Sequence, residues 1–131
     1  MNEDIRKLIA YRLDQAAETL EAARQLRATG HYRDAVNRAY YAMFYCGLAL
    51  LASKGLGASK HSGVLGLFNR YFVKTGEFSV EDGRHLQEAF ELKQGSDYRE
   101  FVQITSEQVQ ETVTKAEAFL EHTRQALASL E

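Results

Sequence analysis

Proline is absent from all 131 residues of this chain, and only nine residues are glycine. Proline interrupts helices and glycine favours tight turns, so a chain with so few of either can form long helices with few loops. Its composition, 45% apolar and 26% charged, is that of a packed globular protein. Because the length is that of one ordinary domain, we expect residues 1–131 to form a single all-α domain of about five helices.

A regular repeat of apolar residues marks the first expected helix, over about residues 3–28. Gly30 follows as a residue that can take the left-handed conformation at a helix end, and a second helix is expected over about residues 32–54. Since the link is short, the two helices should be antiparallel neighbours. The apolar positions of the first helix are Ile5, Ile9, Leu13, Ala16, Leu20 and Ala23.

The second expected helix is the most apolar part of the chain. From Ala39 onward it is apolar on nearly every face, which is typical of a central helix. We interpret Phe44 and Tyr45 as core residues rather than as part of a cofactor site. One face of this helix exceeds what four neighbours would cover in so small a domain, which predicts a homodimer contact.

The sequence does not predict a membrane span or a secreted protein. The longest run without a charged residue, residues 39–53, holds 15 residues, whereas a span needs roughly 20. Residues 1–12 are charged and amphipathic, unlike a secretion signal. Cys46 is the only cysteine, so no intrachain disulfide can form. We therefore expect a cytoplasmic protein that does not contact a membrane.

Two further helices follow a glycine-rich loop. The third is expected over about residues 59–74, with Ser59 as its N-cap. Ser79 holds the cap position of the fourth helix, with Asp82 as its capping-box partner. The apolar pattern predicts that this fourth helix fades near Lys93.

A break is expected before the last helix. Residues 94–101 are polar and include Gly95, so they are interpreted as a loop. Thr105 then caps the last helix, with Gln108 in the capping-box position. Apolar residues repeat at spacings of four and three from Val109 onward, which predicts that this helix packs lengthwise against the others.

Charge is unevenly distributed, although the net charge is only −2. Residues 35–76 carry five bases and no acid, whereas residues 77–131 carry five bases and twelve acids. A fold that gathers the middle segment on one surface would offer a basic patch to a phosphate-bearing ligand. The alternative is that the acidic helices neutralise these bases, and the sequence favours neither outcome.

Arg38 precedes two tyrosines on the second expected helix. A guanidinium that is even partly buried needs a carboxylate or a phosphate to offset its desolvation. Two kinds of partner are open: a structural carboxylate, for instance that of Asp97, or the phosphate of a ligand. Arg38 and the neighbouring Tyr41 are therefore candidate ligand-binding residues.

Lys60 and His61 stand at the start of the third expected helix. Free backbone N–H groups and the helix dipole favour an anion there, and a lysine and an imidazole add to the field. Lys60 is thus a candidate phosphate ligand and His61 a candidate catalytic residue. The alternative is that His61 caps the helix or packs locally.

The segment from Lys93 to Arg99 follows the fourth expected helix. Lys93 and Arg99 could hold a phosphate, Asp97 could take or orient a proton, and Tyr98 could stack on or hydrogen-bond a base. The alternative for Asp97 and Tyr98 is an Asx-turn with a packed ring.

Four short motifs follow one another along the chain. They are Arg-x-Tyr-Tyr-Ala-Met-Phe at 38–44, Lys-His-Ser-Gly-Val at 60–64, Gly-x-Phe-Ser at 76–79, and Ala-Phe-x-Leu-x-x-x-x-Asp-Tyr at 89–98. Together, over roughly residues 10–125, they resemble the small bacterial HEPN (higher eukaryotes and prokaryotes nucleotide-binding) proteins.

This resemblance implies an antiparallel helical bundle that is commonly a homodimer. It also implies production beside a minimal nucleotidyltransferase partner, in pairs that are similar to toxin–antitoxin systems. Many HEPN proteins are metal-independent ribonucleases. Their signature is an arginine followed after four to six residues by a histidine at the dimer interface, where the arginine steadies the phosphate and the histidine handles the proton.

The sequence departs from that signature. Lys93 stands where the arginine is expected, and Asp97 and Tyr98 follow in place of the histidine. Lysine lacks the two-point grip of a guanidinium, and aspartate is a poorer proton shuttle near neutral pH. His61 is the histidine that could substitute in space. No cofactor or metal is expected, because there is one cysteine and the four histidines lack ligand spacing.

Three functions remain open at this point. The first is a HEPN-type module with a degenerate signature that binds a nucleotide, RNA or a nucleotidyltransferase partner. The second is a metal-independent ribonuclease in which Asp97, Tyr98 and His61 handle the proton while Lys93 and Arg38 hold the phosphate. The third is a purely structural helical adaptor.

Overall fold

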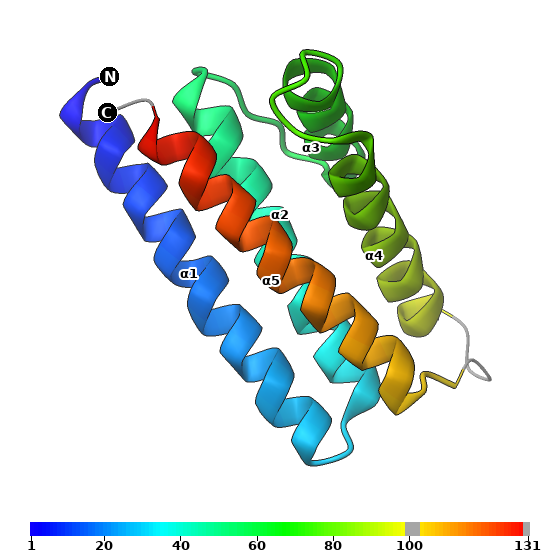
Figure 1. Cartoon of the computed structure of the whole chain (residues 1–131). Coiled ribbons are helices and arrows are strands. Elements are labelled where there is room, and N and C mark those ends of the chain that lie inside the picture. The colour runs from blue at the N-terminus through cyan, green and yellow to red at the C-terminus, as the bar shows by residue number, and fades with distance from the viewer. Residues whose placement is uncertain (99–102, 130–131) are drawn as a thin grey trace.

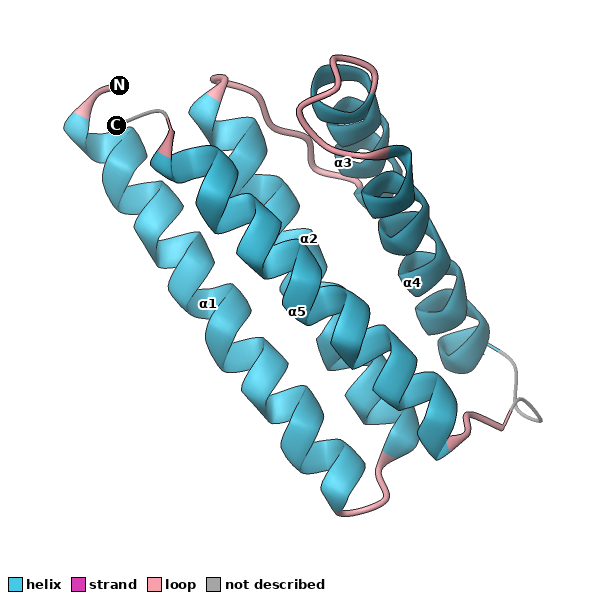
Figure 2. Cartoon of the chain, in the orientation of Figure 1, coloured by secondary structure: helices cyan, strands magenta, loops and turns pink. Residues whose placement is uncertain are grey.

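The computed structural model describes residues 1–98 and 103–129, and in this part of the chain it contains helices and no strand (Figure 2). The fold is therefore the all-α helical bundle that was predicted. The helices are α1 (Glu3–Ala28), α2 (Tyr32–Ser53), α3 (His61–Phe68), the π-helical segment η1 (Asn69–Val73), α4 (Val80–Tyr98) and α5 (Ser106–Ala128).

The long helices lie side by side (Figure 1). α1 and α4 run in one direction, and α2 and α5 run in the other. α2 returns antiparallel to α1 after the short link at Gly30, whose φ of +80° is the left-handed conformation expected there. α5 packs lengthwise on α1 and α2, and α3 with η1 lies beside α4. None of the described helices combines the length and the apolar character that a membrane span requires.

Two of the predicted helix starts are confirmed in detail. The hydroxyl of Thr105 accepts a hydrogen bond of 3.1 Å from the Gln108 N–H, and the Gln108 side chain accepts one of 2.9 Å from the Thr105 N–H. The Ser79 hydroxyl accepts a hydrogen bond of 3.0 Å from the Asp82 N–H. The Asp82 carboxylate does not complete a capping box, because it pairs with His122 of α5 at 3.0 Å.

The predicted start of the third helix was wrong. The N-cap is Lys60 rather than Ser59, and its side chain makes no capping hydrogen bond. This helix also changes type, because the Lys74 N–H bonds to the Asn69 carbonyl at 2.9 Å, five residues back. The resulting π-helical turn places Phe72 in the core, where it is 1% exposed.

The predicted end of the fourth helix was also wrong. α4 continues past Lys93 to Tyr98, so residues 94–98 are helical rather than a loop. Lys93 and Asp97 form an ion pair across one turn, at 2.9 Å, and such pairs stabilise helices. The remainder of the expected loop, residues 99–101, lies outside the described residues.

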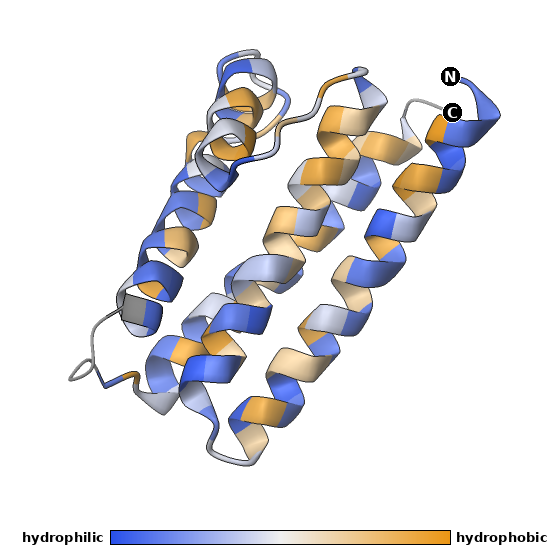
Figure 3. Ribbon diagram, turned by 180° about the vertical axis from the view of Figure 1, so that it is seen from behind, coloured by the Kyte–Doolittle hydropathy of each residue, from blue (hydrophilic) through white to orange (hydrophobic). Residues whose placement is uncertain are grey.

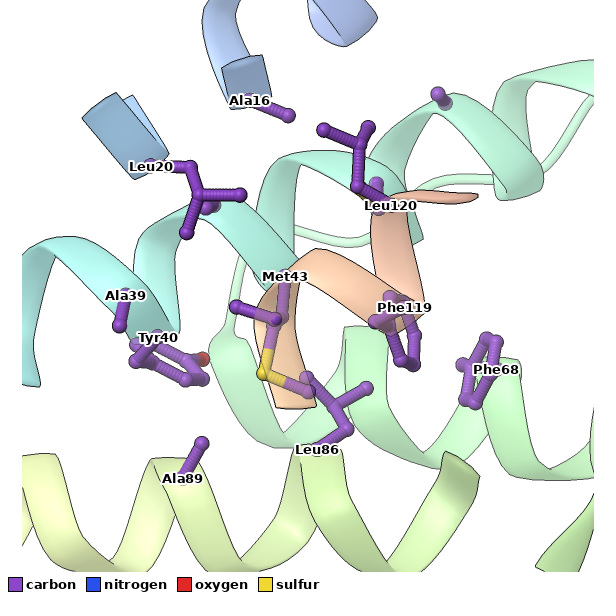
Figure 4. Packing of buried hydrophobic residues seen from close by; sticks show 14 of the residues in the cluster. Ala16, Leu20, Ala39, Tyr40, Met43, Phe68, Leu86, Ala89, Phe119 and Leu120 are labelled. Atoms are coloured by element: carbon purple, nitrogen blue, oxygen red, sulfur yellow. The ribbon is translucent and has the colours of Figure 1, made fainter. Parts of the chain in front are cut away.

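The core gathers around α2, as predicted. Tyr40 and Met43 of α2 face Leu20 of α1 and Leu86 of α4 (Figure 4), and all four are at most 2% exposed. Cys46 of α2 is fully buried, and this burial raises the pKa of its thiol to about 12. Four phenylalanine rings extend the core toward α3 and α5; these are Phe68, Phe72, Phe78 and Phe119.

One face of α2 is only half-buried. Seen from behind, α2 lies in front of α5, between α1 and the α3–α4 pair (Figure 3). Five residues of intermediate exposure follow this helix at spacings of three and four; they are Arg38, Tyr41, Tyr45, Leu48 and Ala52. We refer to these five residues as the α2 stripe.

Candidate functional site

His61, at the start of α3, is held in place by two side chains of α2. Its Nδ1 lies 2.7 Å from the Tyr40 hydroxyl. The imidazole also stacks on the Phe44 ring, with 4.3 Å between the ring centroids and an interplanar angle of 13°. His61 therefore packs against α2, while its second ring nitrogen, Nε2, is not committed to Tyr40.

Burial and a nearby cation set the protonation of this pair. Burial lowers the pKa of His61, and the positive charge of Lys93 lowers this pKa further. Burial raises the pKa of the Tyr40 phenol, so it remains protonated. A neutral imidazole whose Nδ1 accepts the Tyr40 proton carries its own proton on Nε2, which can then donate to an anion.

Lys93 of α4 is a buried cation, 9% exposed. Its Nζ pairs with the Asp97 carboxylate at 2.9 Å and lies 5.6 Å from the centroid of the Tyr41 ring. A cation within about 6 Å of an aromatic face is attracted by the ring. These contacts fix the ammonium group between α4 and α2.

Tyr41 also contacts the second cation of the region. The Arg38 guanidinium lies 4.9 Å from the centroid of the Tyr41 ring. Its Nε and Nη2 donate to the Asn37 side-chain oxygen at 3.1 and 2.7 Å. The suggested structural pair of Arg38 with Asp97 is wrong, since the Asp97 carboxylate pairs with Lys93.

A hollow of about 420 Å³ opens where α3 and α4 meet. We call it the His61 hollow. Among the residues that the structure describes, Lys93 is the one charged group in its lining, which also includes the imidazole of His61. The residues that line it are His61, Ser62, Phe90, Lys93 and Gln94.

The predicted site residues are only partly brought together. Lys60 is exposed at the N-cap of α3 and does not line the His61 hollow. Arg38 and Asp97 are not in its lining either: Arg38 contacts Tyr41, and Asp97 pairs with Lys93. The side chain of Tyr98 and the whole of Arg99 lie outside the described residues.

Sequence reasoning missed the residues that hold and surround His61. Tyr40 was interpreted only as part of an apolar helix, and Phe90 as part of a motif. Phe90 is half-buried and lines the His61 hollow. A signal existed for Phe90, because Phe90, Lys93 and Asp97 are spaced at three and four. On a helix that continues to Tyr98, this spacing places them on one face.

Local acidic residues neutralise part of the basic middle segment. Lys54 pairs with Glu77 at 3.0 Å, as the second alternative predicted. Arg70 lies 5.3 Å from the centroid of its neighbour's ring, that of Tyr71. Across residues 1–98 and 103–129, no group of three His, Cys, Asp or Glu side chains is placed to hold a metal ion.

Comparison with known proteins identifies the family. The model of the HEPN domain matches residues 9–126. A UPF0332 protein of Thermotoga maritima is 46% identical over 121 residues, which cover 92% of this chain and 91% of that protein. In Methanocaldococcus jannaschii, "Putative toxin MJ0142" is 38% identical over 89% of this chain and 80% of its own length. "Putative toxin MJ0605", from the same organism, is 37% identical over 99% of this chain and 96% of its own length. The chain therefore belongs to the HEPN domain family.

Proposed function

We propose that this HEPN protein is a binding module that holds a phosphate group of a nucleotide or of RNA in the His61 hollow. The observation that carries this proposal is the placement of a fixed, buried cation and a neutral imidazole on one hollow. An entering phosphate would share Lys93 with Asp97 and accept a hydrogen bond from Nε2 of His61. The aromatic ring of Phe90, in the same lining, suits the base or sugar beside that phosphate.

Calorimetry with mononucleotides and gel shifts with short RNA, both at low salt, test this function. Lys93→Gln removes the cation and should weaken binding at least tenfold, in line with the strength of charge-assisted hydrogen bonds. Lys115→Gln is the matched control, because Lys115 pairs with Glu88 at 3.5 Å and does not line the His61 hollow. The absence of binding by the intact protein would overturn the proposal.

The ligand affinity of Asp97→Asn is an independent test of the same site. The Asp97 carboxylate competes with a phosphate for Lys93, so its neutralisation should leave binding unchanged or strengthen it. A strong loss of affinity in this variant, with its helicity intact, would contradict the role assigned to Lys93.

We also propose that the protein forms a homodimer through the α2 stripe. The spacing of three and four along this stripe is that of a helix-to-helix seam. Because Tyr41 of the stripe contacts Lys93, which lines the His61 hollow, a second copy would bring two His61 hollows near one interface. Tyr45→Glu should yield a monomer in sedimentation, whereas Tyr11→Glu, on the exposed face of α1, should not. A wild-type monomer at micromolar concentration would overturn the dimer.

The names of two relatives suggest a partner. Both carry the name "Putative toxin", and the resemblance to HEPN proteins implies a nucleotidyltransferase made beside them. We propose that this chain acts in a two-gene, toxin–antitoxin-like pair with a minimal nucleotidyltransferase. Co-expression of the chain with a nucleotidyltransferase encoded beside it should yield a complex during purification. Separate elution of the two proteins would contradict this partnership.

A metal-independent ribonuclease is a second candidate, favoured by the neutral, hydrogen-bonded state of His61. In the tautomer that donates its Nδ1 proton to the Tyr40 oxygen, Nε2 is free to take the proton of an RNA 2′-OH as the 2′-oxygen attacks phosphorus. The 5′-oxygen then leaves and takes a proton from water, while Lys93 stabilises the charged phosphate. Labelled RNA should then be cleaved without added metal, and His61→Asn should abolish cleavage. RNA that stays intact over hours would exclude this activity.

A further inference from the structure

A second hollow continues from the His61 hollow along the seam between α3, η1 and α4. Its volume is about 590 Å³, and we call it the α3–α4 trough. Ser62 and Phe90 line both hollows, so the two form one continuous surface. Both volumes lie within the roughly 300–1,000 Å³ that is typical of small-molecule sites.

The two hollows differ in charge. Within the described part of the chain, Arg84 is the one charged residue that lines the α3–α4 trough. Its guanidinium pairs with Glu81 and, at 3.2 Å, with Glu88. The His61 hollow instead presents Lys93 with the imidazole. An anionic group is therefore favoured at one end of this surface, and an uncharged group at the other.

The walls of the α3–α4 trough are apolar with a few neutral polar groups. Apolar side chains include those of Leu65, Phe68 and Leu86, while Asn69 and Gln87 contribute amides. Amide side chains are the groups that hydrogen-bond the edges of nucleobases, and an aromatic ring such as that of Phe90 can stack on a base. A hydrocarbon chain would use neither amide.

We propose that the α3–α4 trough receives the base of a nucleotide whose phosphate lies in the His61 hollow. This inference rests on the proposed function and adds to it the place where the base of that ligand binds. The ligand is a phosphate attached to an uncharged heterocycle, with the ring of Phe90 at the junction between the two parts.

A glycine on the trough wall makes the proposal testable without disturbing the core. A Cβ built at Gly66 would meet nothing within 4 Å, whereas one at Gly83 would lie 3.0 Å from the Cγ2 of Val73. Gly66→Leu should therefore fill the α3–α4 trough while preserving the fold. Gly57→Leu adds the same side chain to the loop before α3, where a Cβ is equally unobstructed, and serves as the matched control.

The experiment is an NMR titration of backbone amides with inorganic phosphate, ribose 5-phosphate, AMP and hexyl phosphate. All four should shift the amide of Lys93, whereas AMP should in addition shift those of Gly66 and Gly83. AMP should bind at least tenfold more tightly than ribose 5-phosphate. Gly66→Leu should reduce the AMP affinity to that of ribose 5-phosphate and leave phosphate binding unchanged, while Gly57→Leu should change neither.

The outcomes separate the two proposals. Equal affinities for AMP and ribose 5-phosphate, with Gly66 and Gly83 unshifted, would overturn the base site while leaving the phosphate site in place. Hexyl phosphate that matches AMP and is equally sensitive to Gly66→Leu would overturn the base in favour of a hydrocarbon chain. If no phosphate compound shifts Lys93, the proposed function fails, and this inference fails with it.

Discussion

The region formed by α1, α2 and α5 differs in construction from the region formed by α3, η1 and α4. In the first, small residues such as Ala16, Ala23 and Ala39 are fully buried, which lets long helices approach closely. In the second, a π-helical turn and two glycine-lined walls leave the α3–α4 trough beside a buried lysine. One region is closely packed, while the other keeps a hollow beside a cation, where we propose that a ligand binds, and Tyr40 of α2 contacts His61 between them.

The largest expected effect lies where the two regions share a core. Phe119 of α5 is fully buried and contacts the rings of Phe68 and Phe78. Phe119→Ala should lower the free energy of unfolding by about 3–5 kcal/mol, as removal of a buried ring usually does. Urea denaturation measures this loss. Leu8→Ala on the exposed face of α1 is the control, with an expected change within about 0.5 kcal/mol; similar losses in the two variants would contradict the assigned core.

The two helix caps sharpen the comparison. Thr105→Ala at α5 and Ser79→Ala at α4 each remove a hydrogen-bonded cap, at a cost of about 0.5–2 kcal/mol. If the α3–α4 region opens before the rest, Ser79→Ala should speed hydrogen exchange mainly in α4. Thr105→Ala should instead speed it throughout the slowest-exchanging amides. Identical exchange patterns would show that the regions unfold as one unit.

Tyr40→Phe tests the hydrogen bond between Tyr40 of α2 and His61 of α3, which links the two regions. This change removes the hydroxyl that lies 2.7 Å from His61 Nδ1 and keeps the ring. The free energy of unfolding should fall by about 0.5–1.5 kcal/mol, the net value of one hydrogen bond. Chemical denaturation measures it, with Tyr11→Phe on the exposed face of α1 as the control. No loss would mean that His61 is held by stacking alone.

The smallest expected effect is the titration of His61, measured by NMR of its ring protons. Its pKa should lie below the ordinary 6.5, and Lys93→Met should raise it by removing one of the two causes. Because the pKa of His61 is lower in the folded than in the unfolded protein, His61 contributes stability that is fully present above pH 6.5. This contribution is lost as the pH falls from 6.5 toward the folded pKa. The loss of stability between pH 7.5 and 5.5 should therefore be smaller in His61→Asn. An unchanged pKa in Lys93→Met would contradict the coupling.

The sequence predicted most helix boundaries, because their signals are local. Gly30 forms the turn between α1 and α2. Thr105 and Gln108 form the capping box that begins α5 through contacts within three residues. The end of α4 was not predictable from polarity, since Gly95 and its polar neighbours resemble a loop. Burial of Ser96, which is 2% exposed, and the pair of Lys93 with Asp97 keep this segment helical.

The candidate site was predictable residue by residue but not as an arrangement. Lys93 and His61 were recognised from their charge and from the motifs around them. Their shared hollow depends on how α3 folds back onto α2 and α4, and no spacing in the sequence encodes it. Of the two kinds of partner left open for Arg38, the example of Asp97 was wrong, because the continuation of α4 places the Asp97 carboxylate one turn from Lys93.

The burial of Cys46 gives the protein an internal reporter. A thiol reacts as the thiolate, and a pKa of about 12 leaves almost none at neutral pH. Alkylating reagents should therefore modify the native chain only when α2 separates from its neighbours. Since this is the single cysteine, the labelling rate would follow the opening of the whole bundle without any engineered probe.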